Sequence, residues 1–91
     1  MEFGRPYTVT ATGAVYPRRG MVLGYVVTTS ASLTLRLHDN ASAASGTEVL
    51  PTTPAFTAGG TFYRLPVSLA NGLYATVGGT GSVTFYIVDA A

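Results

Sequence analysis

Apolar and polar side chains alternate along much of the chain with a period of two residues. In residues 7–12 (YTVTAT) every apolar side chain is followed by a threonine, and Leu33, Leu35 and Leu37 alternate with polar residues within 32–38. A period of two is typical of β-strands that bury one face. No segment holds apolar residues at i, i+3, i+4 and i+7 behind a helix cap. The pattern therefore predicts an all-β fold.

One segment is apolar on both of its faces. In residues 21–28 (MVLGYVVT), Leu23 and Tyr25 fall on one face, and Val22 and Val26 fall on the other. Strands of this kind are usually buried on both sides. We therefore expect this strand to be central in its sheet and covered on both faces.

Short segments rich in glycine, proline, asparagine and serine divide the strands. Residues 17–20 (PRRG) and 29–31 are predicted turns, and Asn71-Gly72 is typical of a tight hairpin. Residues 78–81 (GGTG) are predicted to close the last hairpin. Residues 39–47 (DNASAASGT) are predicted to form a surface loop. The predicted strand segments are 7–12, 21–28, 32–38, 48–50, 61–65, 67–70, 73–77 and 82–88.

This spacing predicts the architecture. Seven or eight short strands separated by turns are typical of a compact antiparallel β-sandwich or a small jelly-roll-like barrel. Pro6 disfavours a helix before it, so residues 1–6 are expected to form an extended N-terminal arm. Residues 7–91 are expected to form a single β-domain.

Charged residues are scarce. They make up 10% of the chain, as five arginines and four carboxylates with no lysine, whereas soluble domains usually carry about 25%. Because a free monomer relies on charge for colloidal stability, this composition favours a protein that is buried within an assembly. The net charge of +1 argues against a nucleic-acid partner. Cysteine is absent and no apolar run is long enough to span a bilayer, so we expect neither thiol chemistry nor a membrane partner.

The sequence offers little for catalysis or for a cofactor. His38, beside Asp39, is the only histidine, and it is expected to be the outward-facing member of its strand. Active sites need clustered titratable groups, so we expect no enzyme, no catalytic residue and no cofactor. Asp39, Asn40 and Glu48 flank one loop and offer oxygen atoms to Ca²⁺. An Asx-turn is the favoured interpretation of that loop, and no metal site is predicted.

The candidate functional residues are therefore interface residues. Arg18 and Arg19 either lie in a solvated turn or pair with acidic groups of a partner. Tyr74 and Tyr86 are expected to lie opposite each other in the last hairpin, where they form either a sugar-stacking platform or a protein interface. The shortage of charge favours the interface. The complete set of candidates, including the two from the arm, is Phe3, Arg5, Arg18, Arg19, Tyr74 and Tyr86.

Several segments resemble small structural proteins of tailed bacteriophages. The resemblance covers residues 21–88, and His38 stands where those sequences have an aromatic residue. The segments are 33–40 (LTLRLHDN), 41–46 (ASAASG), 61–66 (TFYRLP), 71–80 (NGLYATVGGT) and 82–86 (SVTFY).

The resemblance implies a head decoration (cement) protein. Such a protein would be made in the bacterial cytoplasm and located on the capsid surface of the virion. It would bind the major capsid protein, stabilise the head and assemble with itself, as a homotrimer. The resemblance implies no catalytic residues. The alternative is a carbohydrate- or receptor-binding module, or a minor tail or fibre component, that uses Tyr74, Tyr86 and the 39–47 loop.

Overall fold

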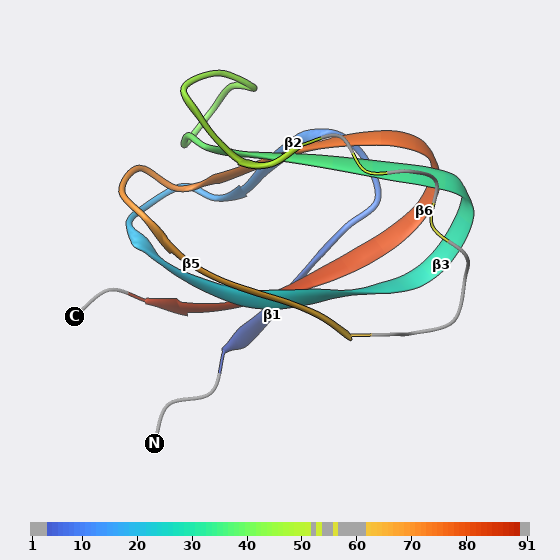
Figure 1. Ribbon diagram of the computed structural model, residues 1–91, viewed down its shortest axis with the longest axis horizontal. Helices are drawn as coiled ribbons and strands as arrows, with labels where there is room; N and C mark the ends of the chain where they lie inside the picture. The colour runs from blue at the N-terminus through green and yellow to red at the C-terminus, as the bar shows by residue number, and fades with distance from the viewer. Residues whose placement is uncertain (1–3, 52, 54–55, 57–61, 90–91) are drawn as a thin grey trace.

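Antiparallel β-strands form the whole regular structure in the computed structural model, which describes residues 4–51, 53, 56 and 62–89 (Figure 1). The all-β prediction is confirmed. Over the described residues no helix is long and apolar enough to cross a membrane. The strands are β1 (Arg5–Val9), β2 (Gly13–Tyr16), β3 (Gly20–Asp39), β4 (Thr47–Leu50), β5 (Phe62–Leu69) and β6 (Leu73–Asp89).

The two longest strands form the centre of a single sheet. β3 and β6 pair from Gly20 opposite Asp89 to His38 opposite Tyr74. β1 and β2 pair with successive parts of β6, whereas β5 and β4 pair with successive parts of β3. Every pairing is antiparallel, and all belong to one sheet.

The sheet bends back on itself near the middle of β3 and β6. Figure 1 shows the two strands curving together, so that their ends lie in facing layers. We name the layers by their outer strands. The β5 half contains β1, the end of β6, the start of β3, and β5, whereas the β4 half contains β2, the start of β6, the end of β3, and β4.

The bend explains why the predicted strand count was too high. The described residues form six strands rather than seven or eight. Three predicted interruptions lie inside continuous strands, so six of the predicted segments merge into three, whereas β2 is an additional strand that the sequence did not predict. Residues 29–31 lie within β3, Pro66 lies within β5, and residues 78–81 lie within β6. The pairings describe one open sheet and do not show the predicted sandwich or barrel.

Gly79 is required where β3 and β6 bend together. Its φ is +72°, a left-handed conformation that L-residues rarely adopt. A Cβ atom at this position would also collide with the backbone carbonyl of Ser32 on β3. The glycine-rich segment therefore allows close packing inside a bent strand instead of closing a hairpin.

The core lies between the two halves. The leucines that alternate in 32–38 face inward as predicted, and Leu33, Leu35 and Leu37 are fully buried. The remaining buried apolar residues are Val15, Tyr16, Val22, Tyr25, Val27, Leu69, Leu73, Ala75, Val83, Phe85 and Ile87.

The segment after β4 helps to close the core. The Thr53 amide donates to the Leu35 carbonyl at 2.9 Å, and the Phe56 amide donates to the Leu33 carbonyl at 2.8 Å. These bonds extend backbone pairing along β3 beyond the end of β4. They place the Phe56 ring 5.2 Å from the Tyr63 ring and 6.1 Å from the Tyr25 ring, measured between centroids.

The start of β3 corrects the expectation for residues 21–28. This segment is central, because it pairs with β5 on one side and β6 on the other. A register shift between Val22 and Gly24 places Val22 and Tyr25 in the core. Leu23 is left on the outer face, and Met21 is 38% exposed. The described residues therefore do not cover both faces. Pro66 lies opposite this shift on β5, an edge strand, where its missing N–H is tolerated.

The arm and the Asn71-Gly72 turn also differ in detail from expectation. β1 already begins at Arg5, within the segment assigned to the arm, whereas residues 1–3 lie outside the described part. Asn71-Gly72 does form a connection, but it links β5 to β6, which do not pair with each other. It is therefore a turn between the two halves and not a hairpin.

Candidate functional site

The acidic side chains are dispersed over the described residues and are already engaged. Glu48 accepts from Arg36, with Nε and Oε2 2.5 Å apart, and Asp89 lies 3.7 Å from Arg18. Both pairs are solvent-exposed. Over the part of the chain that the structure describes, no three His, Asp or Glu side chains gather to hold a metal ion.

The loop after β3 folds around Asn40. Its Oδ1 accepts from the backbone amides of Ser42 at 2.9 Å and Ala43 at 3.0 Å, and its Nδ2 lies 3.2 Å from the Ser45 carbonyl. This is the Asx-turn that the sequence favoured over a Ca²⁺ site.

His38 is buried, contrary to the expectation that it faces outward. Its exposed fraction is 3%, and a register shift between Leu37 and His38 lets consecutive side chains both be buried. The register places it between Tyr74 on β6 and Glu48 on β4. Its Nδ1 atom makes no hydrogen bond with any described residue.

Asp39 holds the turn between β5 and β6. Its Oδ2 accepts from the Ala70 amide at 2.9 Å, and its Oδ1 accepts from the amides of Asn71 at 2.8 Å and Gly72 at 3.2 Å. Partial burial alone would raise the pKa of this carboxyl group. The three backbone hydrogen bonds outweigh burial and lower the pKa below its ordinary value of 3.8. Asp39 is therefore a structural carboxylate that fixes the entry into β6.

Replacing Asp39 with asparagine is expected to destabilise the chain at neutral pH. The amide nitrogen cannot accept a backbone hydrogen bond, and the charge is lost. We expect the free energy of unfolding to fall by about 1–2 kcal/mol. This is the lower end of the range for hydrogen bonds to charged groups, because solvent reaches this carboxylate. The pKa of Asp39 is lower in the folded chain than in the unfolded chain. The stabilisation by the Asp39 carboxylate is therefore complete above pH 3.8 and is lost as the pH falls through the pKa of the folded state.

Urea unfolding of the wild type and of Asp39→Asn, from neutral pH down to pH 2, measures the difference in their free energy of unfolding. The matched control is Asp89→Asn, which removes an exposed carboxylate from a 3.7 Å ion pair and should change stability by less than about 1 kcal/mol. A difference for Asp39→Asn that stays constant down to pH 2 would contradict the assigned role.

The predicted interface residues are not brought together. Arg5 is exposed at the start of β1, and Phe3 lies outside the described residues. Arg18 and Arg19 lie in the turn between β2 and β3, where the Arg18 guanidinium lies 5.2 Å from the centre of the Tyr16 ring.

Tyr74 and Tyr86 do not face each other across a hairpin, because both belong to the continuous strand β6. Tyr74 pairs in register with His38 in the β4 half, and Tyr86 pairs with Gly24 in the β5 half. Both tyrosines are half-buried. They are parts of two different surfaces.

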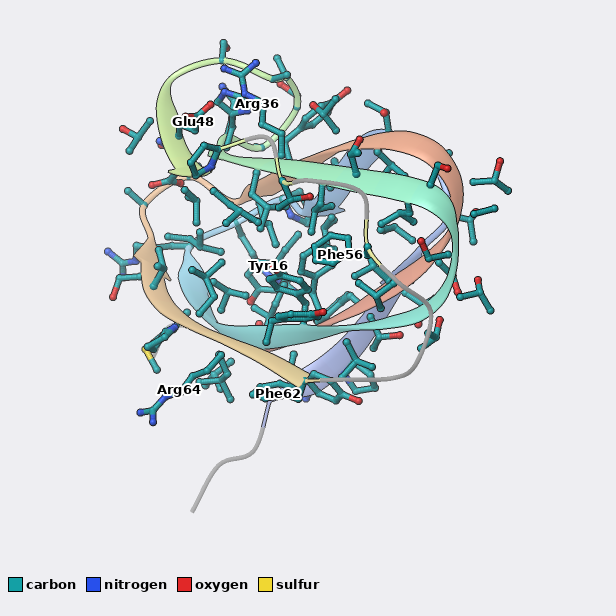
Figure 2. All side chains as sticks on the ribbon, turned by 45° about the vertical axis from the view of Figure 1, so that its right-hand side comes forward. Tyr16, Arg36, Glu48, Phe56, Phe62 and Arg64 are labelled. Atoms are coloured by element: carbon teal, nitrogen blue, oxygen red, sulfur yellow. The ribbon has the colours of Figure 1, made fainter. Side chains whose placement is uncertain are left out.

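The outer surface of the β5 half carries both large hydrophobic side chains that are exposed among the described residues, Met21 and Phe62. We call it the Phe62 face. Phe62, 50% exposed, lies on β5 beside Arg64, and Figure 2 shows both side chains outside the layer, whereas Tyr16 lies between the halves. The side chains of the face, by strand alternation and exposure, are Pro6, Thr8, Met21, Leu23, Val26, Phe62, Arg64, Pro66, Ser68, Thr84, Tyr86 and Val88.

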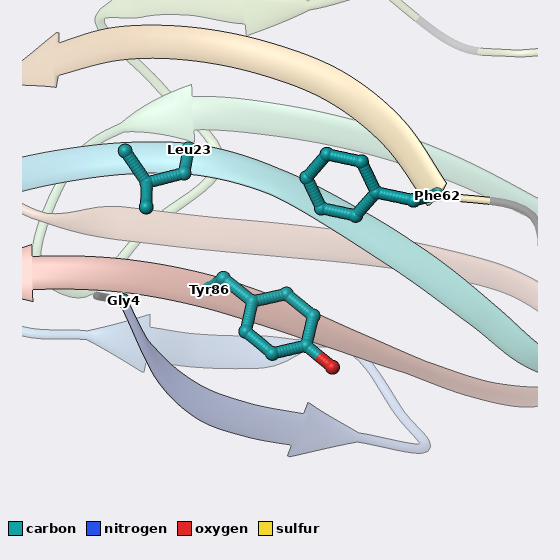
Figure 3. Close-up of a pocket in the computed structure, with 4 residues that line it drawn as sticks. All are labelled: Gly4, Leu23, Phe62 and Tyr86. Atoms are coloured by element: carbon teal, nitrogen blue, oxygen red, sulfur yellow. The ribbon is translucent and has the colours of Figure 1, made fainter.

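A hollow of about 340 Å³ lies in the Phe62 face. Its lining residues are Gly4, Leu23, Phe62 and Tyr86, from adjacent parts of the sheet (Figure 3). The only side-chain polar atom among them is the Tyr86 hydroxyl. The hollow therefore suits an apolar group.

The strand positions fix the aromatic wall of this hollow. Gly24 on β3 pairs with Arg64 on β5 and with Tyr86 on β6, and Phe62 is the next outward-facing residue on β5. A Cβ atom on Gly24 would collide with the Phe62 ring and with the Tyr63 carbonyl, so the ring lies directly over the glycine. The rings of Phe62 and Tyr86 meet edge to face with centroids 6.0 Å apart.

Sequence reasoning identified Tyr86 but missed Leu23 and Phe62. Two features of the sequence were consistent with an apolar outer surface. Residues 21–28 are apolar on both faces, and Phe62-Tyr63 places aromatic rings on both faces of β5. Such strands indicate either full burial or an apolar surface, and the structure places Phe62 and Met21 at an exposed surface.

Comparison of the chain with protein-family models, with curated proteins and with solved structures finds no match in any of the three.

Proposed function

We propose that this chain is a structural protein of a tailed-phage virion. It binds the major capsid protein on the outside of the shell as a decoration protein and stabilises the head. The observation that carries this proposal is the Phe62 face, an apolar sheet surface with one charged side chain, Arg64. The resemblance of residues 21–88 to small phage structural proteins points in the same direction.

The physical character of the face fits a cementing role. Exposed apolar patches of this kind mark interaction surfaces in soluble proteins. A contact made largely of uncharged groups depends little on salt, because screening acts on charges. The continuous β3–β6 pairing holds the face on one sheet, so binding requires little ordering of the chain.

Self-association into a homotrimer is part of the proposal. Within the described part of the chain, β1, β2, β4 and β5 each pair with one other strand, which leaves one edge of each without a strand partner there. Proteins usually guard such edges with lysine, and this chain has none. Light scattering of purified protein at micromolar concentration is expected to give three times the chain mass, and a strict monomer would contradict the trimer.

Purified phage particles whose genome encodes this chain provide the test of function. Mass spectrometry should find the chain in particles after density-gradient purification, in a fixed ratio to the major capsid protein. Particles that lack it should release their DNA at a lower temperature. Absence of the chain from purified particles contradicts a virion role, and its location on the tail by labelled electron microscopy favours a tail or fibre component.

A sugar-binding module is the less favoured function. Sugar sites combine an aromatic platform with several convergent polar groups, and sites in general use a few such groups to fix orientation. The hollow in the Phe62 face offers one polar side-chain atom, the Tyr86 hydroxyl.

A further inference from the structure

We propose that the Phe62 face binds a protein other than a second copy of this chain. That partner inserts one aliphatic side chain into the hollow between Leu23, Phe62 and Tyr86 and places a carboxylate against Arg64. The inference rests on the proposed function, and it specifies the surface and the chemistry that the partner must present.

The first argument is the shape and composition of the hollow. It is open to solvent, and its walls are an aliphatic side chain, two aromatic rings and Gly4. A volume of about 340 Å³ accommodates a side chain such as leucine together with neighbouring atoms. Aromatic walls of this kind are typical of the centre of protein interfaces, where a few residues supply most of the binding energy.

The second argument is that the aromatic wall is preorganised. Phe62 lies over Gly24 and against Tyr86, so its ring contacts the sheet on two sides while half of its surface stays exposed. A side chain that is already fixed loses little rotamer freedom on binding. Phe62 is therefore suited to be the principal contact residue.

The third argument concerns charge and decides between a second copy and a different protein. Among the residues that the structure describes, Arg64 is the only charged side chain of the Phe62 face, and it is exposed. If two copies met through this face, no described residue of the face would offer a carboxylate to Arg64.

The carboxylates elsewhere in the described residues already have partners within the chain. Asp39 binds three backbone amides, Glu48 binds Arg36, and Asp89 pairs with Arg18. Complementary charge across an interface selects the partner and its orientation. A carboxylate from a different protein is the complement that this face lacks.

The test uses three acetylated and amidated peptides, Gly-Asp-Leu-Asp-Gly, Gly-Asn-Leu-Asn-Gly and Gly-Asp-Ser-Asp-Gly. Each is titrated into the full chain while the NMR signals of Leu23, Phe62 and Tyr86 are followed. The first peptide should bind most tightly. The asparagine peptide should bind about threefold more weakly, the size expected for an exposed ion pair, and the serine peptide should cause no saturable shift.

Two variants connect these effects to the residues. Phe62→Ser should abolish binding of the leucine peptides, and an unchanged pattern of backbone signals shows that the variant remains folded. Arg64→Gln should retain binding but remove the preference for aspartate over asparagine. Arg19→Gln is the matched control, because it removes an exposed arginine from the turn between β2 and β3 and should leave that preference unchanged.

Three outcomes would overturn the inference. One is equal binding of the aspartate and asparagine peptides, and another is a failure of every peptide to shift the three residues. The third is self-association of the chain that Phe62→Ser abolishes, because the face would then be occupied by a second copy. Incorporation into phage particles tests the function separately: absence of the wild type refutes the function, whereas incorporation of Phe62→Ser at the wild-type level refutes only the inference.

Discussion

Replacing Gly79 with alanine is expected to destabilise the chain by about 3 kcal/mol or to prevent folding altogether. The φ of +72° at this position costs an L-residue about 1–2 kcal/mol. The added methyl group also collides with the Ser32 carbonyl of β3, which lies between the two pairs that flank the bend, Ala31 with Thr80 and Thr34 with Gly78. Overpacking of this kind adds about 1–3 kcal/mol.

Urea unfolding followed by circular dichroism measures this loss. The matched control is Gly13→Ala at the start of β2, where a Cβ atom would meet no other atom within 4 Å. We expect the control to change stability by less than about 0.5 kcal/mol. If both variants were equally stable, the bend would not depend on Gly79.

The same segment shows how far local sequence signals reach. Residues 78–81 (GGTG) were predicted to close a hairpin, because adjacent glycines commonly do so. A bend inside a long strand uses the same property, a positive φ and close backbone approach. A hairpin turn and a strand bend differ in the strand with which the segment pairs. Here β6 continues to pair with β3, with Thr80 opposite Ala31 and Gly81 opposite Ser30. That partner lies some fifty residues away in the sequence.

Predictions that depended on alternation within a strand were more successful. The alternation of Leu33, Leu35 and Leu37 with polar residues correctly indicated which face is buried. Alternation fails at a register shift, because one extra residue reverses the faces that follow. His38 and Val22 lie beside such shifts. His38 is buried instead of facing outward, and Val22 shares the core face with Tyr25 instead of lying on the opposite face.

The candidate surface was predictable only in part. The shortage of charge drew attention to interfaces, and Tyr86, which lines the hollow, was among the residues selected. The sequence did not reveal that Tyr86 would meet Phe62 over Gly24, since these residues come from three different strands. Such a juxtaposition follows from strand order and register, which a single sequence specifies only weakly.

The second large effect is expected at Phe85, and Phe62 is its natural comparison. Phe85 is fully buried on β6 and packs against Tyr25, with ring centroids 5.9 Å apart. Truncation to alanine opens a cavity between the two halves of the sheet, and such changes cost about 3–5 kcal/mol. A domain of this size has a total stability of roughly 5–15 kcal/mol, so Phe85→Ala should unfold at a much lower urea concentration.

Phe62→Ala removes the same group of atoms from the other face of the same sheet. Because half of the Phe62 side chain is already exposed, less apolar area returns to water, and we expect a loss of about 1 kcal/mol. If the free energy of unfolding depends on urea concentration with the same slope in both variants, their urea midpoints measure the difference between the two stability losses. Equal losses would contradict the assignment of inner and outer faces. A large difference means that the fold depends little on the Phe62 ring, whose exposed half is then available for contact with another protein.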